Sequence, residues 1–409
     1  MSATQPLYQT IARRISTACG AKLSKPACKR LALLVCGIIA ARSTVIAQVA
    51  AEINALQLTA ACCSSNVERG LRRTLNDARL TPQNCYTPLL NAALDWPALL
   101  RGSKRVVLAV DESSKSDQTH LLRLSISYWG GSLPLAWLTW PQNVAQQPGH
   151  YWQQLDHLFA QVAQLLPPGL VVILTADRAY GVPNFIDRCT KQGWHYVVRL
   201  TTTGSHRYLD ERGVEWEVSQ LVKQRLKRRG QRFKARGQLF KEAQWRKVNL
   251  VGLWSNNAKE SLVLISDLAA SYELLALYER RFWIEPGFRN DKSRGWQWEK
   301  SQVQQEQHQA VLLVAMALAS LVVVCAGIAA AQERTANEEQ RRKGGCVSKP
   351  QRAKESIFTL GLGKLRQWLY QRAGELVWRL PELDGISWLR RWHACQARWF
   401  VLPPARQAA

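Results

Sequence analysis

The sequence predicts an α/β fold, because short apolar strands and amphipathic helices follow one another through its central part. The first three strands are separated only by short polar turns, so they are expected to form an antiparallel meander. In chain order the elements are strands at 104–110, 121–129 and 133–140, a helix at 151–166, a strand at 170–175, a helix at 184–191 and a strand at 195–200. This is the order of a ribonuclease-H-like domain. We therefore predict a ribonuclease-H-like core whose first part spans residues 101–200.

Residues 1–100 are predicted to form a helical region ahead of this core. An apolar run at 29–41 has helical periodicity, and Ser43 or Thr44 can cap the helix that follows it. The segment 64–75 is a further helix with arginines along one face. Short helices with a basic face are typical of helix-turn-helix DNA-binding regions. Three-helix packing with no nucleic-acid role gives a similar pattern, and it remains the alternative.

Residues 201–268 are predicted to form a β-rich basic insertion in the core, because short alternating segments lie between Gly-rich turns. From 223 to 247 there are eleven Lys or Arg and a single acid, with aromatic residues between them. Such a stretch can neutralise phosphates and stack on bases, although a solvated basic hairpin is the simpler alternative. The predicted DNA contacts in this insertion are Lys227, Arg228, Arg229 and Trp254.

The chain is expected to return to the core at 269–331, which ends in an apolar stretch at 310–331. This stretch is long enough to cross a membrane. It is solitary and Ala-rich, so we predict a buried core helix and no membrane partner, with a membrane span as the alternative.

The last part of the chain is predicted to be a linker followed by helices. Residues 332–356 are polar and charged, which is typical of a linker. Residues 357–409 contain two amphipathic helices, at 357–379 and 386–400. These helices can pair with a second subunit or cover the core.

Composition narrows the class of partner. The 409 residues include 55 Lys and Arg against 30 Asp and Glu, a net charge of +25 with a pI of about 10. Such a balance is typical of proteins that bind a polyanion, and nucleic acid is the natural candidate. The ten cysteines are scattered and have no metal-ligand spacing, and the first 26 residues lack the apolar segment of a secretory signal. We therefore expect a cytoplasmic protein without a zinc site.

Two acids stand where predicted strands end. Asp111 closes the first strand, and Asp177 closes the fourth. These strands are neighbours in the predicted topology, so both carboxylates are expected at the same end of the sheet. Either acid alone would suggest only the start of a turn.

A second pattern lies farther along the chain. Tyr278, Arg281, Glu285 and Lys292 are spaced by three, four and seven positions, which return to nearly one face of a regular helix. An acid flanked by bases suits a site that holds a metal ion and binds a phosphate backbone. Ion pairing on a solvated helix face is the commoner explanation of the same spacing.

Taken together, these residues resemble the DDE transposases of bacterial insertion sequences, in particular the insertion sequence 4 family with its Y-R-E-K signature. The similarity covers roughly residues 60–330. It rests on Asp111 in Val-Asp-Glu-Ser, Asp177 in Asp-Arg-Ala-Tyr-Gly, and the four spaced residues.

The resemblance implies a cut-and-paste DNA transposase. Asp111, Asp177 and Glu285 would be the catalytic and metal-binding residues, holding two Mg²⁺ ions, with Mn²⁺ as a substitute. Cleavage of a donor end by water or a 3′-hydroxyl would be followed by strand transfer into target DNA. The implied partners are double-stranded DNA, as inverted-repeat ends and target, and a second copy of the chain. The implied DNA contacts near the acids are Tyr278, Arg281, Lys292 and Arg178.

The chain departs from the family pattern at the residues used for a hairpin intermediate. Phe282 follows the arginine of the signature, where a tryptophan is common in the family, and the strand at 261–266 contains no tryptophan. The route of strand excision therefore stays open. A ribonuclease-H-like nuclease and an inactive DNA-binding regulator are the alternative functions.

Overall fold

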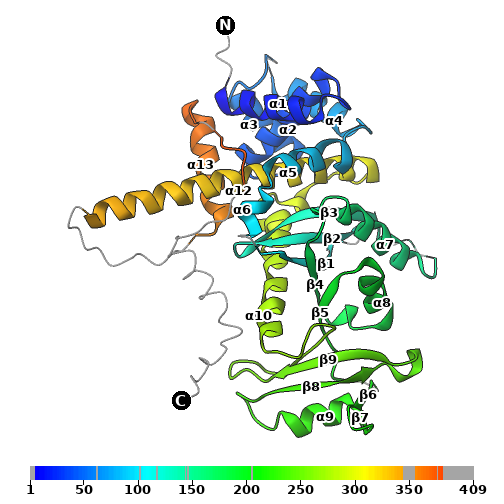
Figure 1. Cartoon of the computed structure of the whole chain (residues 1–409). Helices are drawn as coiled ribbons and strands as arrows, with labels where there is room; N and C mark the ends of the chain where they lie inside the picture. Colours follow the sequence, from blue (N-terminus) through cyan, green and yellow to red (C-terminus); the bar gives the residue numbers. More distant parts are fainter. Residues whose placement is uncertain are drawn as a thin grey trace.

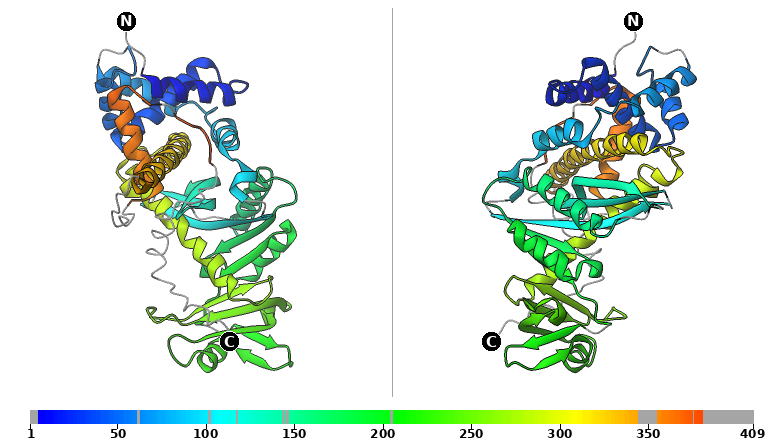
Figure 2. Two further views of the ribbon diagram at one scale, coloured as in Figure 1. Left: turned by 60° about the vertical axis from the view of Figure 1, so that its left-hand side comes forward. Right: turned by 90° about the vertical axis from the view of Figure 1, so that its right-hand side faces the viewer.

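The computed structural model describes residues 5–380, except 61–62, 101–102, 117, 143, 145–146, 204–205, 344–354 and 375. The molecule is elongated, with a helical layer at one end, a mixed sheet in the middle and a smaller β-rich part at the other end (Figure 1). The two additional views show the same succession from other sides (Figure 2).

The regular elements described in the N-terminal part are helices joined by short turns. Its longest helix, α2 (Lys25–Ala41), is buried along most of its length and packs against its neighbours α1 and α3. The arginine-rich helix α4 keeps Val67 and Leu71 in the core and leaves Arg72 and Arg73 exposed. The elements are α1 (Pro6–Cys19), α2, α3 (Ile46–Ala55), α4 (Ser64–Leu75), η1 (Pro82–Tyr86), α5 (Thr87–Ala93) and α6 (Trp96–Leu100).

The central sheet confirms the predicted ribonuclease-H-like core. Its first five strands lie in the order β3-β2-β1-β4-β5, with β1, β2 and β3 antiparallel and β1, β4 and β5 parallel. The strands and helices of this core are β1 (Arg105–Lys115), β2 (Thr119–Tyr128), β3 (Gly131–Pro141), α7 (His150–Ala163), β4 (Val171–Ala176), α8 (Pro183–Gln192) and β5 (His195–Arg199). Strand β1 is longer than predicted, because its polar second half pairs with β2 as far as Lys115.

Residues after β5 add five more strands to the same sheet. Strand β10 pairs with β5, so the order continues β5-β10-β9-β8-β6-β7 without interruption. The short helix α9 lies beside these strands at the far end of the molecule (Figure 1). The added elements are β6 (Arg207–Asp210), β7 (Glu215–Glu217), α9 (Val218–Arg225), β8 (Arg232–Leu239), η3 (Lys241–Ala243), β9 (Arg246–Leu253) and β10 (Leu262–Ser266).

The segment that contains the four spaced residues is helical but not one regular helix. It changes from α10 (Glu273–Glu279) to the 3-10 turn η4 (Arg280–Trp283), then to α11 (Ile284–Arg289) and the π-turn η5 (Asn290–Arg294). Pro286 lacks an N–H donor, and its ring disfavours a regular helical turn before it. The expectation of a single helical face was therefore wrong. After the 3-10 turn η6 (Trp298–Lys300), the chain enters the long helix α12.

Helix α12 (Glu306–Lys343) contains the apolar stretch predicted as a core helix. It is apolar enough to cross a membrane, yet 89% of its most apolar window is buried against the rest of the chain. The pair α2 and α3, bent by 94°, passes the same test only when taken together. The burial of α12 agrees with a core helix.

The predicted linker at 332–356 was wrong in its first half, because α12 continues to Lys343. Residues 332–343 contain neither Gly nor Pro and are rich in Glu, Gln and Arg, which favour helix. The following helix, α13 (Ile357–Gln371), packs closely on α12 where Gly361 meets the backbone of Val323 and Gly327. The helix predicted at 386–400 lies outside the described residues.

Candidate active site

The register of β1 and β4 sets Asp111 level with Asp177. The last pair of this parallel ladder is Ala109 with Thr175, and each acid follows two residues later. Continuing the same register places the two aspartates opposite each other, just beyond the paired part of the two strands, with Asp177 after the end of β4 and Asp111 inside the longer β1. The predicted convergence of these strand ends agrees with this geometry.

The two aspartates differ in what holds them. Asp111 remains within β1, where it lies opposite Arg123 of β2, and its side chain is 16% exposed. Asp177 follows the last residue of β4 and caps the 3-10 turn η2 (Arg178–Tyr180), accepting the backbone N–H of Ala179 at 2.8 Å. The backbone on each side of the pair is therefore fixed by local hydrogen bonds.

Arg281 joins Asp111 to Glu285. Its Nη2 donates to Asp111 Oδ2 at 3.0 Å, and its Nη1 donates to Glu285 Oε1 at 2.8 Å. The guanidinium is 11% exposed, and its buried Nε has no hydrogen-bond partner. One side chain therefore bridges acids that lie 174 positions apart in the chain, while its Nε–H donor stays unsatisfied.

The surroundings of Asp111 are electrostatically unfavourable for its charge. The pKa of Asp111 is raised to about 6: burial is the largest cause, Arg281 opposes it, and Asp177 and Glu285 act in the same direction as burial. Burial also raises the pKa of Tyr278, to about 12, so this phenol is neutral at physiological pH. Asp111, Asp177, Tyr278 and Glu285 each interact electrostatically with Arg281, which agrees with a single site around this guanidinium.

Three carboxylates provide the oxygen ligands that Mg²⁺ and Mn²⁺ prefer. The donor types therefore fit a divalent cation, but their present placement does not. Within the described ranges, no three His, Cys, Asp or Glu side chains are grouped closely enough to hold a metal ion. Arg281 instead supplies the positive charge between Asp111 and Glu285.

Lys292 lies apart from this bridge. Its ammonium in η5 is 3.9 Å from the carboxylate of Glu299 and is 28% exposed. The preceding residue, Asp291, is buried and forms a 2.7 Å ion pair with Arg123, whose guanidinium lies 4.8 Å from the Phe288 ring centre. This pair fixes the helical segment against β2, and it leaves Lys292 on the accessible side.

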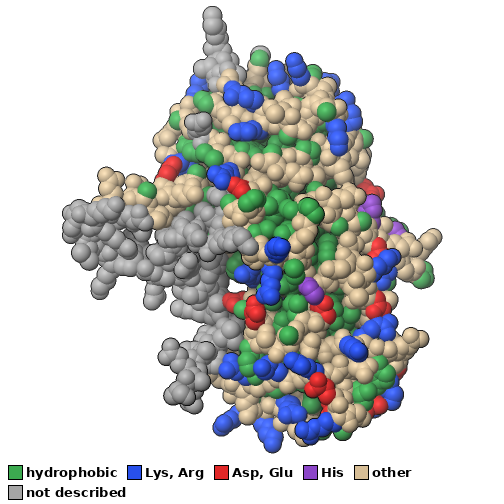
Figure 3. Space-filling model, in the orientation of Figure 1, with side chains coloured by type: hydrophobic (Ala, Val, Ile, Leu, Met, Phe, Trp, Pro, Cys, Tyr) green, Lys and Arg blue, Asp and Glu red, His purple; other side chains and the backbone are tan. Residues whose placement is uncertain are grey.

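The other predicted DNA contacts lie at two separate places. Arg178 is exposed in η2, next to Asp177. Lys227, Arg228 and Arg229 are exposed in the turn between α9 and β8, two elements at the far end of the molecule (Figure 1). Lys and Arg side chains are frequent on that end in the space-filling view (Figure 3). Trp254 is half-buried beside that turn, and its indole N–H donates to Ala258. The structure does not bring these insertion residues to the acids.

Sequence reasoning missed a cluster on the opposite face of β1. Glu112 accepts hydrogen bonds from His120, Tyr151 and Tyr180, with 2.7 Å to His120 Nε2 and 2.8 Å to the Tyr180 hydroxyl. Burial raises the pKa of Glu112, but these three hydrogen bonds outweigh it and hold the pKa below its usual value. The available signal was that Glu112 follows Asp111 and Tyr180 comes three residues after Asp177.

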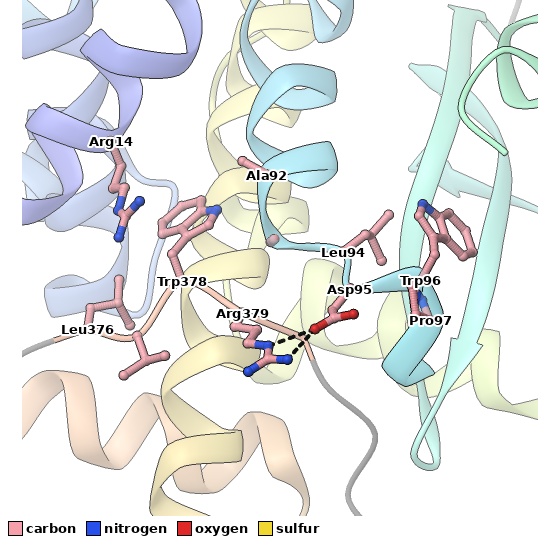
Figure 4. Close-up of a pocket in the computed structure, with 11 residues that line it drawn as sticks. Arg14, Ala92, Leu94, Asp95, Trp96, Pro97, Leu376, Trp378 and Arg379 are labelled. Atoms are coloured by element: carbon pink, nitrogen blue, oxygen red, sulfur yellow. Dashed lines mark hydrogen bonds and ion pairs between the residues drawn. The ribbon is translucent and has the colours of Figure 1, made fainter. Parts of the chain in front are cut away.

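A separate pocket lies well away from the acids, between the N-terminal helices and residues 376–379. Its volume is about 620 Å³, and its lining includes Arg14, Trp96 and Trp378 (Figure 4). An ion pair between Asp95 and Arg379 closes one side. None of the five acid-site residues lines it.

Comparisons with known proteins find a transposase family over part of the chain. Residues 139–322 match the model of the Transposase DDE domain family, a range that includes Asp177 and the segment from Tyr278 to Lys292 but not Asp111. A search of curated proteins finds no match. Among solved structures, the chain is similar to the piggyBac transposase synaptic complex with hairpin DNA determined by cryo-EM. The identity is 10%, the TM-score is 0.44, and the alignment covers 98% of this chain and 84% of that one.

Proposed function

We propose that this chain is a DNA transposase that cleaves the ends of a mobile element and transfers them into target DNA. The observation that carries the proposal is the shared level of Asp111 and Asp177, with Glu285 joined to the same site through Arg281. The transposase-domain match over 139–322 and the net charge of +25 support it.

In this proposal Asp111, Asp177 and Glu285 bind two divalent cations, Mg²⁺ in the first instance with Mn²⁺ as a substitute. Such cations would stabilise the charge on the attacking and leaving oxygens during in-line displacement at phosphorus. The protein contributes the paired strands β1 and β4, which place Asp111 and Asp177 opposite each other. It also contributes a helical segment anchored by the buried Arg123–Asp291 pair, which carries the third.

Arg281 has two mutually exclusive roles in this scheme. Its forked donors suit a DNA phosphate as well as they suit carboxylates. When a phosphate binds Arg281, Asp111 and Glu285 lose their shared counter-charge and become available as ligands. Arg178 and Lys292 are assigned to the same DNA backbone, because both carry an accessible positive charge near the acid site. Tyr278 was predicted as a third contact, but its side chain is only 2% exposed and packs in the core, so we assign it to packing beside Arg281.

The basic turn at the far end of the molecule is assigned to a more distant part of the DNA. Lys227, Arg228 and Arg229 are exposed, and the described residues offer them no ion pair. The exposed arginines of α4 provide a second basic surface. The proposal has three further parts. The protein is cytoplasmic, it forms a homodimer in the complex with paired DNA ends, and it belongs to the insertion sequence 4 family.

The test uses a supercoiled plasmid that carries the coding region with its natural flanking DNA. Purified full-length protein with Mg²⁺ should cut near the two flanks and join the released ends to a second plasmid. Asp111→Asn, Asp177→Asn and Glu285→Gln should each abolish cutting while DNA binding persists, and Glu273→Gln, which alters an exposed acid outside the site, should not. Cleavage by any of the three site variants at the wild-type rate would overturn the proposal. Cutting without joining would favour a nuclease instead.

A further inference from the structure

The hydrogen-bonded cluster around Glu112 connects the two segments that carry the aspartates. Tyr151 and Tyr180 both donate to Glu112 Oε1, and their hydroxyl groups lie 2.9 Å apart. His120 occupies the other carboxylate oxygen, and Trp140 stacks on its ring with centroids 4.5 Å apart. The cluster therefore joins β1 to β2, α7 and η2 at one point.

Glu112 is placed for this purpose by strand geometry. Successive side chains of a strand point to opposite faces, so Asp111 faces Arg281 while its neighbour Glu112 faces α7 and η2. The core agrees with this alternation. Val107 packs with Leu274 and Tyr278 on the face that carries α10, whereas Leu108 belongs to the core on the other face.

The parallel ladder alone does not hold the two aspartates together. Its last pair, Ala109 with Thr175, lies two residues before either acid. Beyond that pair, Tyr180 provides the next direct hydrogen bond between the two segments: it belongs to the turn capped by Asp177 and donates to the residue that follows Asp111. Tyr180 is 3% exposed, so this bond is protected from exchange with water.

We propose that Glu112 is a positioning residue, which through Tyr180 and Tyr151 fixes the separation of the Asp111 and Asp177 carboxylates. The inference rests on the proposed function, since it assigns the cluster to that same site. Glu112 contacts no DNA and no cation in this role. It keeps Asp111 and Asp177 opposite each other when the charges around the two aspartates change.

Four variants test this role in the plasmid cleavage assay. Glu112→Ala removes the acceptor, and Tyr180→Phe removes one donor while keeping the ring. Glu112→Gln keeps an amide oxygen that can accept from both phenols. Tyr86→Phe is the matched control, because Tyr86 is fully buried and its hydroxyl donates to Pro134 at 2.7 Å, outside the site. Each variant is measured for single-turnover cleavage rate, KM for DNA, Mn²⁺ affinity by electron paramagnetic resonance, and melting temperature.

Glu112→Ala should lower both the cleavage rate and the Mn²⁺ affinity about 10- to 100-fold, as expected when a residue that orients metal ligands is lost. Tyr180→Phe should lower both in the same direction. KM for DNA should stay unchanged, and Glu112→Gln should restore most of the rate. The control should lower only the melting temperature.

A wild-type cleavage rate in Tyr180→Phe and Glu112→Ala would overturn the inference. A loss that simply follows the melting temperature, equal to that of Tyr86→Phe, would overturn it too. Asp111→Asn separates this result from failure of the proposed function. If that variant cuts normally, the proposed function fails, whereas an inactive Asp111→Asn beside a fully active Glu112→Ala removes only the positioning role.

Discussion

Arg281 donates to Asp111 across 3.0 Å while its second amino group binds Glu285. A guanidinium thus occupies a position between two carboxylates that a divalent cation would otherwise neutralise. Removing one partner of such a partly buried group leaves the others uncompensated. The affinity of the acids for metal should therefore depend on where Arg281 is.

Replacing Arg281 should strengthen metal binding and abolish cleavage. In Arg281→Gln the acids lose a competing cation, so DNA-free protein should bind Mn²⁺ about tenfold more tightly, the change expected from about 1.4 kcal/mol of lost competition. Cleavage should fall because a phosphate contact is missing. Isothermal titration calorimetry checks the affinity. Arg105→Gln, which breaks an exposed pair with Glu273, is the control and should bind Mn²⁺ as the wild type does. Weaker binding by Arg281→Gln would contradict the bridging role.

Metal binding to the DNA-free protein should weaken in mild acid. The pKa of Asp111 is raised to about 6, chiefly by burial, so below that pH a proton occupies the carboxylate. Metal must then displace the proton, and the Mn²⁺ affinity should fall by up to about tenfold per pH unit below pH 6. Above pH 6 the affinity should be flat with respect to this group. Titrations at several pH values measure it, and a profile unchanged in Asp111→Asn would assign the effect elsewhere.

Breaking the buried pair Arg123–Asp291 should be strongly destabilising. Their side chains are 7% and 8% exposed, so Asp291→Ala leaves an uncompensated buried guanidinium, which costs about 3–5 kcal/mol. Urea unfolding measures the loss. Converting both residues to leucine should recover much of it, because no charge is then buried. A double variant less stable than Asp291→Ala would show that the pair itself, and not the orphaned charge, supplies the stability.

The insertion turn should contribute to the salt dependence of DNA binding. Changing Lys227, Arg228 and Arg229 together to Gln removes three phosphate-neutralising charges. The slope of log affinity against log salt should become shallower by about 2–3. The control is Arg246→Gln in the same insertion, since Arg246 already pairs with Asp187 at 2.7 Å. Fluorescence anisotropy at several salt concentrations decides, and equal slopes in the triple variant and the wild type would exclude the turn as a DNA contact.

The sheet core was predictable because apolar runs and turn residues identify its strands locally. The common level of Asp111 and Asp177 followed from strand adjacency in the same way. The full length of β1 was not predictable, because the polar residues after Val110 carry no strand pattern. Only their pairing with β2 extends the strand. The helical spacing of Tyr278 and Glu285 predicted a regular helix, whereas the segment with Pro286 changes from a 3-10 turn to a short α-helix.

Contacts between distant side chains were beyond sequence reasoning. The spacing of Arg281 from Glu285 could suggest one partner, but no local pattern relates Arg281 to Asp111, which lies 170 positions away. The donors to Glu112 come from three elements at 120, 151 and 180, and no local pattern relates them. The helical continuation of α12 was missed because charged residues suggested a linker, whereas its lack of Gly and Pro favoured helix.

The pairing of β10 with β5 gives the molecule a geometric property. Strand pairing runs without a break from β3 to β7 among the described strands, so the basic turn and the acids belong to one sheet. Neighbouring strands of such a sheet are rotated relative to one another in a fixed sense. A DNA duplex bound to the outer strands would therefore be held at a defined angle to the strands that carry the acids.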